Sequence, residues 1–382
     1  MSFYFEPDLS AGSFRNSSLA TELANQLMGQ GSIDVITTIP NRYSSFDISA
    51  PKFEQRDNIN IYRISVPGHR SGFVDQIGTF NSYFSGAKKI AAENKYDLVF
   101  ASSSRLFTAY LGYKIAKKQK KPLYLDIRDI FTDTMQEVLK NSLVRSIVIP
   151  VLKQIETKVF NYASHINLIS GGFEPYFVKY KRPAYSVFSN GIDPEFLEVS
   201  PSRTHSGPKV ITYAGNIGEG QGLHKIIPQS AKKLGPEYQF IVIGDGGAKQ
   251  KLLDQIIQIG VKNVEMRKPV SREELLQFYK ASDFLFIHLN DYNAFKKVLP
   301  SKVFELGAYD KPIIAGVAGF ANNFITNQIS NCIVFLPADV DDFVKKVKNY
   351  VYKTEFRKEF IDKYKRENIN KQMAMNILSY LK

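Results

Sequence analysis

The chain has 382 residues, of which 44% are hydrophobic and 23% charged, a balance that excludes a disordered or fibrous chain and, at this length, favours two folded domains. Its formal net charge of +13 indicates an anionic partner, for which nucleic acid, an anionic membrane surface and phosphorylated substrates are the candidates. Because no Arg-rich tract or helix-turn-helix pattern stands out, nucleic acid is not expected.

The chain opens on a short apolar segment, Ser2–Phe5, which turn-rich residues 6–13 and a helix predicted from about Ser17 to Gly29 follow. A strand, a glycine-containing loop and a helix in this order form the first unit of a Rossmann domain. Only four residues precede the loop, whereas a strand usually runs about five or six. We therefore expect the first strand to be truncated, with the natural start upstream.

Short apolar strands then alternate with amphipathic helices, which predicts a doubly wound parallel sheet. The predicted strands are 33–37, 59–66, 96–101, 122–129, 165–169 and 184–188, and the predicted helices are 73–94, 106–120 and 134–162. The strand at 122–129 ends in Asp126, Arg128 and Asp129, and doubly wound sheets bind their ligands at the carboxyl ends of strands.

The predicted helical segment Asn141–Tyr162 alternates apolar residues with Arg145, Lys153 and Lys158, just after Lys140. One interpretation is a helix that lies in a membrane interface. The other is a helix that packs on the core and exposes its basic face to solvent.

A second α/β pattern begins after 199–208, which has the composition of an interdomain linker. Its predicted strands are 210–213, 240–243, 284–287, 312–315 and 332–336, and helices fill the chain from Val340 to the end. We predict one domain at 1–198, a second at 209–355, and C-terminal helices at 356–382 that could pack on either domain, including back on the first.

Cys332 is the single cysteine of the chain, so an internal disulfide is excluded. This favours a reducing, cytoplasmic setting, and we find no signal-peptide pattern at the amino end. The unbroken apolar runs also fall short of the roughly 20 residues that a membrane-spanning helix needs.

The most glycine-dense segment is Tyr213–Leu223, between a predicted strand and a predicted helix. Its backbone amides could approach a diphosphate closely, and the helix that follows would add a positive dipole. A tight turn that satisfies only itself is the alternative for an isolated glycine loop.

The segment Leu299–Ala308 predicts a short helix with Ser301 as its N-cap. Lys302 would add positive charge at the helix start, and Glu305 would lie one turn further on, where a carboxylate can accept two ribose hydroxyls. The alternative is an ordinary amphipathic helix with a capping serine and a nearby acid.

Taken together, these segments resemble the retaining glycosyltransferases of family 4 over almost the entire chain. The segments that recur in the order of the family are the N-terminal glycine loop, Asp126–Asp129, Asn190–Asp193, the loop after Tyr213, Gly244–Gly246, Ala281–Asp283 and the Glu305 segment. The resemblance implies an α/β protein of GT-B fold, with two facing Rossmann-like domains that have parallel sheets. The first domain would bind the acceptor, and the second would bind a nucleotide sugar.

For the donor site, the resemblance implies that Glu305 holds the ribose as the second acid of a Glu-x7-Glu motif. The first acid is replaced by Lys297, and the usual Arg and Lys of the diphosphate loop are replaced by Asn216 and Gln221. Lys296, Lys297 and Lys302 are candidates for the missing positive charge, and we favour Lys302. The further donor-binding residues that we expect are Gly215, Gly218, Gly222, Gly244, Gly246 and Ser301.

In the first domain, Gly12, Ser13, Arg15 and Asp126 are expected to bind the acceptor or phosphate, and Arg128 and Asp129 to act in catalysis together with Lys302. Retention in this family is thought to need no protein nucleophile, because the leaving diphosphate helps deprotonate the acceptor. The main task of the site is then charge stabilisation. An internal ion pair of Asp126 and Asp129 with Arg128 is the alternative.

We expect neither a metal ion nor another cofactor. Asp339–Asp342 resembles the metal motif of the other large transferase class, but these residues precede a helix and suit N-capping. The five histidines lack the spacing of metal ligands, and His224 is expected to pack or cap.

The resemblance thus predicts transfer of a hexose or N-acetylhexosamine, such as N-acetylfucosamine, from a nucleotide sugar that is expected to be UDP-linked. The acceptor would be a polyprenyl-diphosphate-linked saccharide in O-antigen, lipopolysaccharide or capsule biosynthesis, at the inner face of the cell membrane with peripheral contact to anionic lipid. A nucleotide-sugar 2-epimerase and a catalytically silent nucleotide-sugar-binding subunit are the alternatives.

Overall fold

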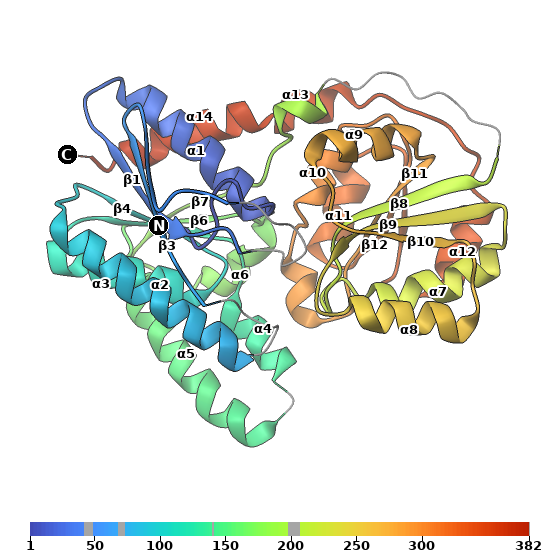
Figure 1. Cartoon of the computed structure of the whole chain (residues 1–382), viewed down its shortest axis with the longest axis horizontal. Helices are drawn as coiled ribbons and strands as arrows, with labels where there is room; N and C mark the ends of the chain where they lie inside the picture. Colours follow the sequence, from blue (N-terminus) through green and yellow to red (C-terminus); the bar gives the residue numbers. More distant parts are fainter. Residues whose placement is uncertain (42–48, 68–72, 140, 198–206, 382) are drawn as a thin grey trace. The chain divides into compact units, whose positions relative to one another are not determined.

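The computed structural model describes residues 1–41, 49–67, 73–139, 141–197 and 207–381. It divides into two compact units: unit 1 consists of Met1–Asn190 and Asn368–Lys382, and unit 2 of Gly191–Glu367 (Figure 1). Apart from its last two residues, the predicted linker at 199–208 lies outside the described residues.

Unit 1 contains two groups of strands. In the first, β1 (Ile33–Thr38) pairs in parallel with β3 (Ile59–Ile64), and β3 pairs antiparallel with β2 (Phe53–Arg56). In the second group, four parallel strands lie side by side in the order in which they occur in the sequence. They are β4 (Val99–Ser103), β5 (Leu123–Ile127), β6 (His165–Leu168) and β7 (Ala184–Ser186).

The backbone of the first two residues lies between these groups. The amide of Ser2 donates to the Ile36 carbonyl of β1 at 3.2 Å, and the amide of Ser102 in β4 donates to the Met1 carbonyl at 3.0 Å. The Met1 amine donates to the carbonyl of Phe100 at 2.8 Å. Met1 and Ser2 therefore occupy the position of a strand between β1 and β4, although the segment Ser2–Phe5 is not itself assigned as one.

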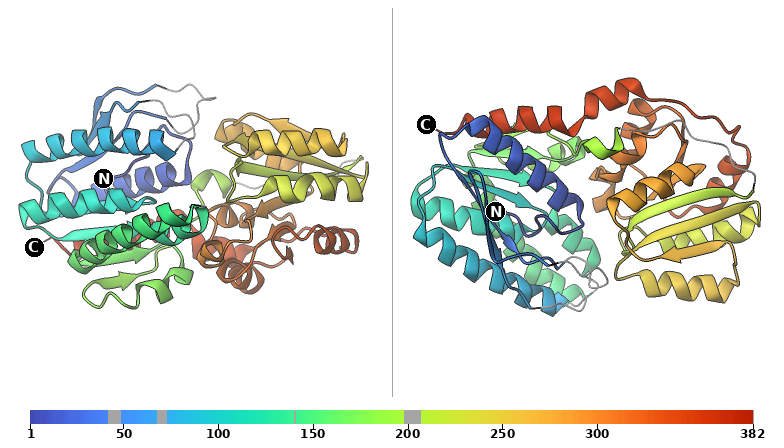
Figure 2. Two further views of the ribbon diagram at one scale, coloured as in Figure 1. Left: turned by 90° about the horizontal axis from the view of Figure 1, so that it is seen from below. Right: turned by 45° about the horizontal axis from the view of Figure 1, so that its top comes forward.

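Helices cover both faces of the strands in unit 1, as Figure 2 shows. Their bounds are α1 (Ala11–Leu27), α2 (Phe73–Glu93), α3 (Leu106–Gln119), α4 (Phe131–Val138), α5 (Ser142–Tyr162), η1 (Gly171–Phe173), α6 (Glu174–Phe177) and α14 (Arg366–Leu378). The helix α14 starts in unit 2 and contributes Met373, Ala374 and Ile377 to a core that it shares with Leu19 and Leu23 of α1.

The helix α1 begins at Ala11, six residues before the predicted start near Ser17. The Ser10 side chain caps it by accepting a hydrogen bond from the Ser13 amide at 3.1 Å. The prediction of a glycine loop through Gly12 and Ser13 is therefore wrong, because both residues lie in the first turn of the helix.

Unit 2 is built on six parallel strands in the order β10-β9-β8-β11-β12-β13. Their bounds are β8 (Lys209–Asn216), β9 (Tyr238–Asp245), β10 (Val264–Arg267), β11 (Phe284–His288), β12 (Ile313–Gly316) and β13 (Cys332–Phe335). Numbered from the first strand of the unit, this order is 3-2-1-4-5-6, the order of the Rossmann fold. Every residue of β11 is buried, as expected for a central strand with helices on both faces.

The helices of unit 2 form the outer layers. Their bounds are η2 (Pro194–Phe196), α7 (Leu223–Leu234), α8 (Lys249–Ile259), α9 (Arg272–Ala281), η3 (Asn293–Lys297), α10 (Lys302–Gly307), α11 (Phe320–Gln328), α12 (Val340–Lys348) and α13 (Lys358–Tyr364). Two apolar cores result, and α13 adds Phe360 and Ile361 to the one that contains α10.

Candidate functional site

The strand order of unit 2 reverses between β8 and β11. From these neighbouring parallel strands the chain continues toward opposite edges of the sheet, because β9 follows β8 on one side and β12 follows β11 on the other. In doubly wound sheets, the carboxyl ends of the strands at such a reversal form the ligand crevice. The loops after β8, β9 and β11, together with α10, are therefore the candidate site in unit 2.

The loop after β8 is held by its own polar side chains. Asn216 Nδ2 donates to Gln221 Oε1 at 2.8 Å, and the amide of Gly218 donates to the same oxygen at 3.3 Å. The Tyr213 hydroxyl donates to the Asn216 carbonyl at 2.7 Å. The two side chains that stand where an Arg and a Lys were expected are thus bonded to each other and shape the loop before α7.

Glycines allow the loops after β8 and β9 to touch. A Cβ at Gly244 would lie 1.9 Å from the carbonyl oxygen of Gly215, and a Cβ at Gly246 would lie 2.7 Å from the carbonyl oxygen of Ile217. Gly222 precedes α7 with a φ of +59°, in the left-handed region that favours glycine. These glycines are therefore required by the packing of the chain itself.

The helix α10 brings a lysine and a glutamate to the loop after β8. Lys302 Nζ donates to Glu305 Oε2 at 2.6 Å, and the two side chains are 28% and 9% exposed. A Cβ at Gly215 would lie 3.8 Å from Lys302 Cε, so the lysine runs along the glycine loop. The structure thus brings together Gly215, Lys302 and Glu305, three of the predicted donor-binding residues.

The surroundings of Lys302 keep it charged. Burial lowers the pKa of Lys302, but the Glu305 carboxylate and the neighbouring Tyr279 outweigh this effect, and the pKa is raised overall. Burial raises the pKa of Tyr279 itself to about 12. Because an ammonium group has three donors, the hydrogen bond to Glu305 leaves donors that could meet an anion.

Ser301 occupies the N-cap position of α10, as predicted, but its side chain does not cap the helix. The residue has helical dihedral angles, φ −58° and ψ −32°, and its side chain makes no capping hydrogen bond. Helical hydrogen bonding starts before it, because the Val303 amide donates to the Pro300 carbonyl at 3.1 Å. Lys297, at the position of the missing first acid, lies in η3.

His288, at the end of β11, was missed as part of this site. The imidazole is 1% exposed and bonds the Gln221 carbonyl through Nδ1 at 2.6 Å, while its Nε2 accepts from the Ala338 amide at 2.9 Å. Burial lowers the pKa of His288 to about 4, so the ring is neutral at pH 7. It ties the glycine loop to the start of the α12 region, a contact that no local motif could reveal.

Asn290 is a second residue that the sequence did not single out. Its side chain donates to the Glu219 carbonyl at 2.9 Å and accepts from Lys225 Nζ at 3.0 Å. Its amide donates to the Gly220 carbonyl at 2.8 Å. The loop after β8 is therefore fastened to β11 as well as to β9.

In unit 1, Arg15 and Asp126 form an internal ion pair. Arg15 Nε and Nη2 donate to the two carboxylate oxygens, each at 3.0 Å, and the side chains are 1% and 0% exposed. Asn167 Nδ2 also donates to Asp126 Oδ1, at 2.8 Å. Burial raises the pKa of Asp126, but Arg15 outweighs it and the pKa is lowered overall. The pairing partner of Asp126 is thus Arg15, whereas the alternative from the sequence was Arg128.

Arg128 lies against the first turn of α1. A Cβ at Gly12 would lie 2.0 Å from Arg128 Nη1, so a larger residue at this position would displace the guanidinium. The Arg128 amide donates to the Ser103 carbonyl at 2.9 Å. The structure therefore brings Gly12 and Arg128 together at the carboxyl ends of β4 and β5.

Asp129 differs from Asp126 in its ionisation. Burial raises the pKa of Asp129 to about 6, although Thr134, whose hydroxyl donates to Asp129 Oδ1 at 3.3 Å, opposes the shift. A carboxyl group with this pKa can exchange a proton near neutral pH.

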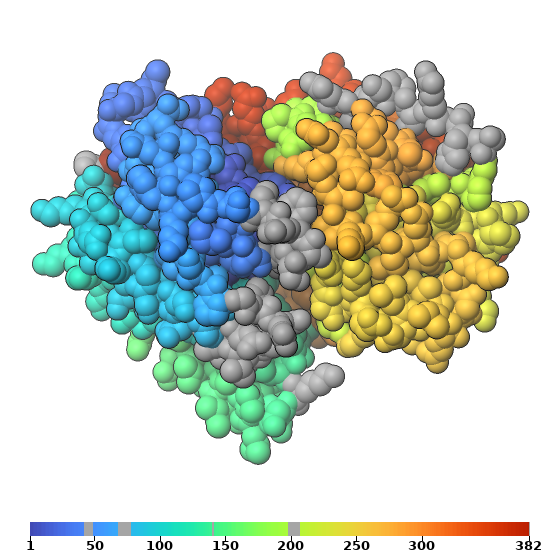
Figure 3. Space-filling model, in the orientation of Figure 1, coloured from blue at the N-terminus to red at the C-terminus, as the bar shows by residue number. Residues whose placement is uncertain are grey.

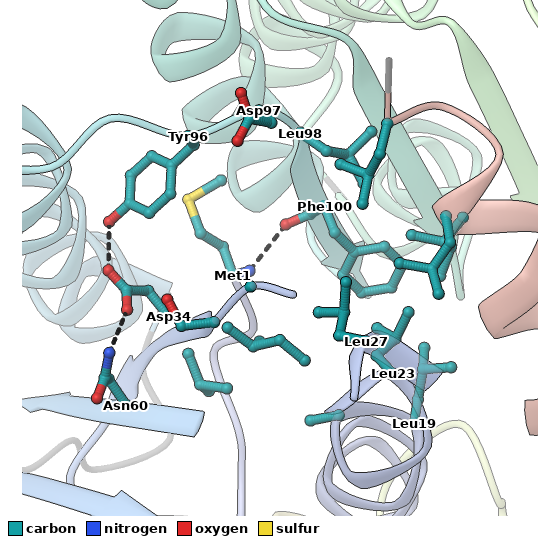
Figure 4. A pocket seen from close by; sticks show the side chains of 18 of the residues that line it. Met1, Leu19, Leu23, Leu27, Asp34, Asn60, Tyr96, Asp97, Leu98 and Phe100 are labelled. Atoms are coloured by element: carbon teal, nitrogen blue, oxygen red, sulfur yellow. Dashed lines mark hydrogen bonds between the residues drawn. The ribbon is translucent and has the colours of Figure 1, made fainter. Parts of the chain in front are cut away.

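A cavity of about 510 Å³ lies elsewhere in unit 1, beside Met1 and at the amino ends of β1 and β4 (Figure 4). Apolar side chains of α1 line one side of it. On the other side, the carboxylate of Asp34 accepts from the Tyr96 hydroxyl at 3.0 Å and from Asn60 Nδ2 at 2.9 Å. Since doubly wound sheets bind ligands at the opposite ends of their strands, this cavity is not part of the candidate site.

Asp339 caps α12, as its side chain accepts from the Asp342 amide at 2.9 Å. Across the described ranges, no group of three or more His, Cys, Asp or Glu residues is arranged to hold a metal ion. Within the same part of the chain, none of the helices has the length and apolar character needed to cross a membrane.

Comparison with known proteins supports the family resemblance. Residues 197–367 match the sequence model of the family described as glycosyl transferases group 1. Over 95 residues, it is 33% identical to the protein of Escherichia coli (strain K12) named as a colanic acid biosynthesis glycosyl transferase, WcaI. That match spans about a quarter of each protein, 25% of this chain and 23% of the relative.

Solved structures resemble the whole chain. Anabaena Alr3699/HepE in complex with UDP and glucose has a TM-score of 0.68 at 15% identity, with 99% of both chains covered. The lipopolysaccharide outer core galactosyltransferase WaaB has a TM-score of 0.63 at 16% identity, with 100% of both covered. WaaG, a glycosyltransferase involved in lipopolysaccharide biosynthesis, has a TM-score of 0.64 at 14% identity, with 100% of this chain and 95% of that chain covered. The fold is thus an α/β fold of GT-B type.

Proposed function

We propose that the protein is a metal-independent, retaining glycosyltransferase that binds a UDP-sugar in unit 2. The observation that carries the proposal is the Lys302–Glu305 pair beside the glycine loop, within the domain that matches glycosyl transferases group 1. The Anabaena structure that contains UDP and glucose supports the choice of nucleotide.

In this proposal, Glu305 holds the ribose and Lys302 meets the diphosphate. The lysine engages Glu305 through Oε2, so Oε1 is the oxygen that can accept a ribose hydroxyl. The ammonium keeps its charge because its pKa is raised, and it can stabilise the negative charge that grows on the leaving diphosphate. The shaped loop at 216–222 would add backbone amides rather than charged side chains.

The proposed acceptor is a polyprenyl-diphosphate-linked saccharide in O-antigen, lipopolysaccharide or capsule assembly at the cytoplasmic face of the membrane. The transferred unit would be a hexose or an N-acetylhexosamine such as N-acetylfucosamine. The names of WcaI, WaaB and WaaG support a role in surface polysaccharides. Asp129, with its pKa of about 6, would orient the acceptor hydroxyl, and Arg128 would add positive charge.

The test is transfer of label from radiolabelled UDP-sugars to extracted lipid acceptors, with Glu305→Gln compared with the wild type. Glu237→Gln, an exposed acid of unit 2, is the matched control. We expect lipid labelling by the wild type and the control, and its loss in Glu305→Gln. Normal transfer by Glu305→Gln would contradict the assignment of Glu305.

A silent nucleotide-sugar-binding subunit is the second candidate, because Lys297 replaces an acid and the Asn216 and Gln221 side chains bond each other. UDP-sugar binding without any labelled lipid would favour it. A 2-epimerase would release a free sugar in the absence of acceptor.

A further inference from the structure

Another cavity of unit 1, with a volume of about 460 Å³, lies where the neighbouring helices α2 and α3 end. Its lining includes residues 94–97, which precede β4, and Lys121, which precedes β5. The cavity is therefore at the amino ends of these strands, whereas Arg128 and Asp129 follow the carboxyl end of β5. Figure 3 shows the light-blue and cyan surface of unit 1 to which the segments around the cavity belong.

The charged side chains that line this cavity are almost all basic. They are five lysines and one aspartate, and we call the space between them the lysine cavity: Lys88, Lys95, Lys114, Lys118, Lys121 and Asp97. The aspartate is already paired, because Lys121 Nζ lies 3.0 Å from Asp97 Oδ1. Within the ranges that the structure describes, no carboxylate forms an ion pair with the other four lysines. Their positive charges are therefore not balanced by the protein at this place.

Two of these lysines are held in matching positions on α2 and α3. Lys88 Nζ lies 5.6 Å from the ring centroid of Phe84, one turn earlier on α2. Lys114 Nζ lies 5.2 Å from the ring centroid of Tyr110, one turn earlier on α3. The two rings stack on each other, with centroids 6.2 Å apart. Because a cation is attracted to the face of an aromatic ring, both ammonium groups are positioned before a ligand binds, which lowers the entropy that binding costs.

The ends of the two helices do not explain the lysines. A lysine near a helix C-terminus often binds the last carbonyl groups of the helix. Here Gln119 Nε2 donates to the carbonyls of Ala91 and Asn94 at the end of α2, each at 3.0 Å. At the end of α3, the backbone amide of Lys121 donates to the Ala116 carbonyl at 2.9 Å. An amide side chain and the backbone thus satisfy these carbonyls, so lysine side chains are not required for the purpose.

We infer that the lysine cavity binds a small soluble ligand that carries a chain of phosphate groups. A lysine acts on phosphate as a point charge with three donors, so lysines from several elements can share one phosphate chain. The volume of the cavity falls within the range of small-molecule sites, about 300–1,000 Å³. A flat anionic surface would meet only the rim of a space between two helices, which favours a ligand that can enter it. The inference goes beyond the proposed function and does not depend on it.

The experiment is calorimetric titration of the full chain with tripolyphosphate at low ionic strength. The wild type is expected to bind tripolyphosphate at one site in unit 1, and to bind inorganic phosphate at least about tenfold more weakly, because fewer charges meet the lysines. The double variant Lys88→Gln/Lys114→Gln should lower the affinity for tripolyphosphate by about tenfold or more. Absence of binding by the wild type would overturn the inference.

The matched control is Lys89→Gln/Lys117→Gln. It removes two exposed lysines from the same two helices, with the same loss of charge, but neither residue lines the cavity. Its affinity for tripolyphosphate should stay within about twofold of the wild type, because salt screens charges that do not contact the ligand. Equal losses in the two double variants would show attraction by net charge alone and would overturn the inference.

The candidate donor site of unit 2 could also attract phosphate, and Lys302→Met separates the two sites. Binding of tripolyphosphate should survive in Lys302→Met and be lost in Lys88→Gln/Lys114→Gln. The opposite pattern would place the phosphates in unit 2 and contradict the inference, whatever the transfer assay shows. Acetylation of lysines, read by mass spectrometry, locates the ligand directly: tripolyphosphate should protect Lys88 and Lys114 but not Lys89.

Phosphates of lipid headgroups are tested with vesicles that contain phosphatidylglycerol. Vesicle binding that Lys88→Gln/Lys114→Gln abolishes, in a protein that does not bind tripolyphosphate, would show that the lysines contact a membrane and would overturn the inference. Unchanged circular dichroism establishes that these substitutions leave the fold intact.

Discussion

Lys302 and Glu305 are bonded to each other at 2.6 Å, although both were expected to face a ligand. The lysine satisfies the carboxylate, which is 9% exposed, and the carboxylate holds the lysine in its charged form. A ligand that enters this site meets an ordered ion pair rather than two independent side chains.

The first prediction concerns the free energy of unfolding of variants at this pair. Lys302→Met leaves the Glu305 carboxylate without its partner and is expected to cost about 1–3 kcal/mol, less than for a fully buried pair because the lysine is 28% exposed. The double variant Lys302→Met/Glu305→Gln should cost less than the sum of the single variants. Thermal unfolding of all four proteins measures the coupling, and strictly additive costs would show that the pair does not contribute.

A second prediction separates structure from substrate binding at Arg15. Arg15→Ala leaves Asp126 charged and buried, so unit 1 should lose about 3–5 kcal/mol of stability. Arg15→Lys should also destabilise it, because an ammonium cannot reproduce the two parallel hydrogen bonds to Asp126. Calorimetry compares these variants with Arg145→Ala, an exposed control. A stable Arg15→Ala protein that only loses acceptor binding would contradict the structural role.

The third prediction is that the free energy of unfolding depends on pH through the titration of Asp129. Its pKa, about 6 in the folded protein against 3.8 as the reference, means that the folded state holds the proton more tightly. The group therefore contributes stability that is present below pH 4 and lost as the pH rises through about 6. Asp129→Asn should be more stable than the wild type at pH 7, and the difference should vanish near pH 4.

If Asp129 also orients the acceptor, transfer by the wild type should fall as the pH drops below about 6, because the carboxylate becomes protonated. Rate profiles of the wild type and of Asp129→Asn between pH 5 and 8 measure this. An unchanged inflection in Asp129→Asn would assign it to another group.

The fourth prediction uses two adjacent glycines. Gly246→Ala would place a Cβ 2.7 Å from the Ile217 carbonyl oxygen, whereas a Cβ at Gly247 meets nothing within 4 Å. Gly246→Ala should therefore displace the loop and lower UDP affinity by about tenfold or more, while Gly247→Ala stays close to the wild type. Calorimetric titration with UDP measures both, and equal affinities would mean that the loop does not contact the nucleotide.

Central strands were predictable from the sequence, as were the edge strands β7 and β13, whereas the edge strands β2 and β10 were not. The strand β11 is a run of apolar residues because it is buried on both faces. By contrast, β2 and β10 were missed because they lie at the edges of their sheets and carry few buried residues, so they lack the apolar runs on which the prediction relied. The early start of α1 was missed because Gly12 suggested a loop, while Ser10 provides the cap.

For the candidate site, the sequence could predict residues that are close in the chain. Lys302 and Glu305 are three positions apart, and helical geometry places such residues together. Arg15 and Asp126 are 111 positions apart, and the Gln221 carbonyl lies 67 positions from His288. Only the folded sheet brings such pairs into contact, so their partners could not be read from local spacing.

The position of Met1 and Ser2 between β1 and β4 makes the choice of a purification tag a structural decision. Burial lowers the pKa of the Met1 amine to about 5. A peptide joined to Met1 would supply an amide that can donate to the Phe100 carbonyl in the same way, and its backbone would have to run through the cavity of Figure 4.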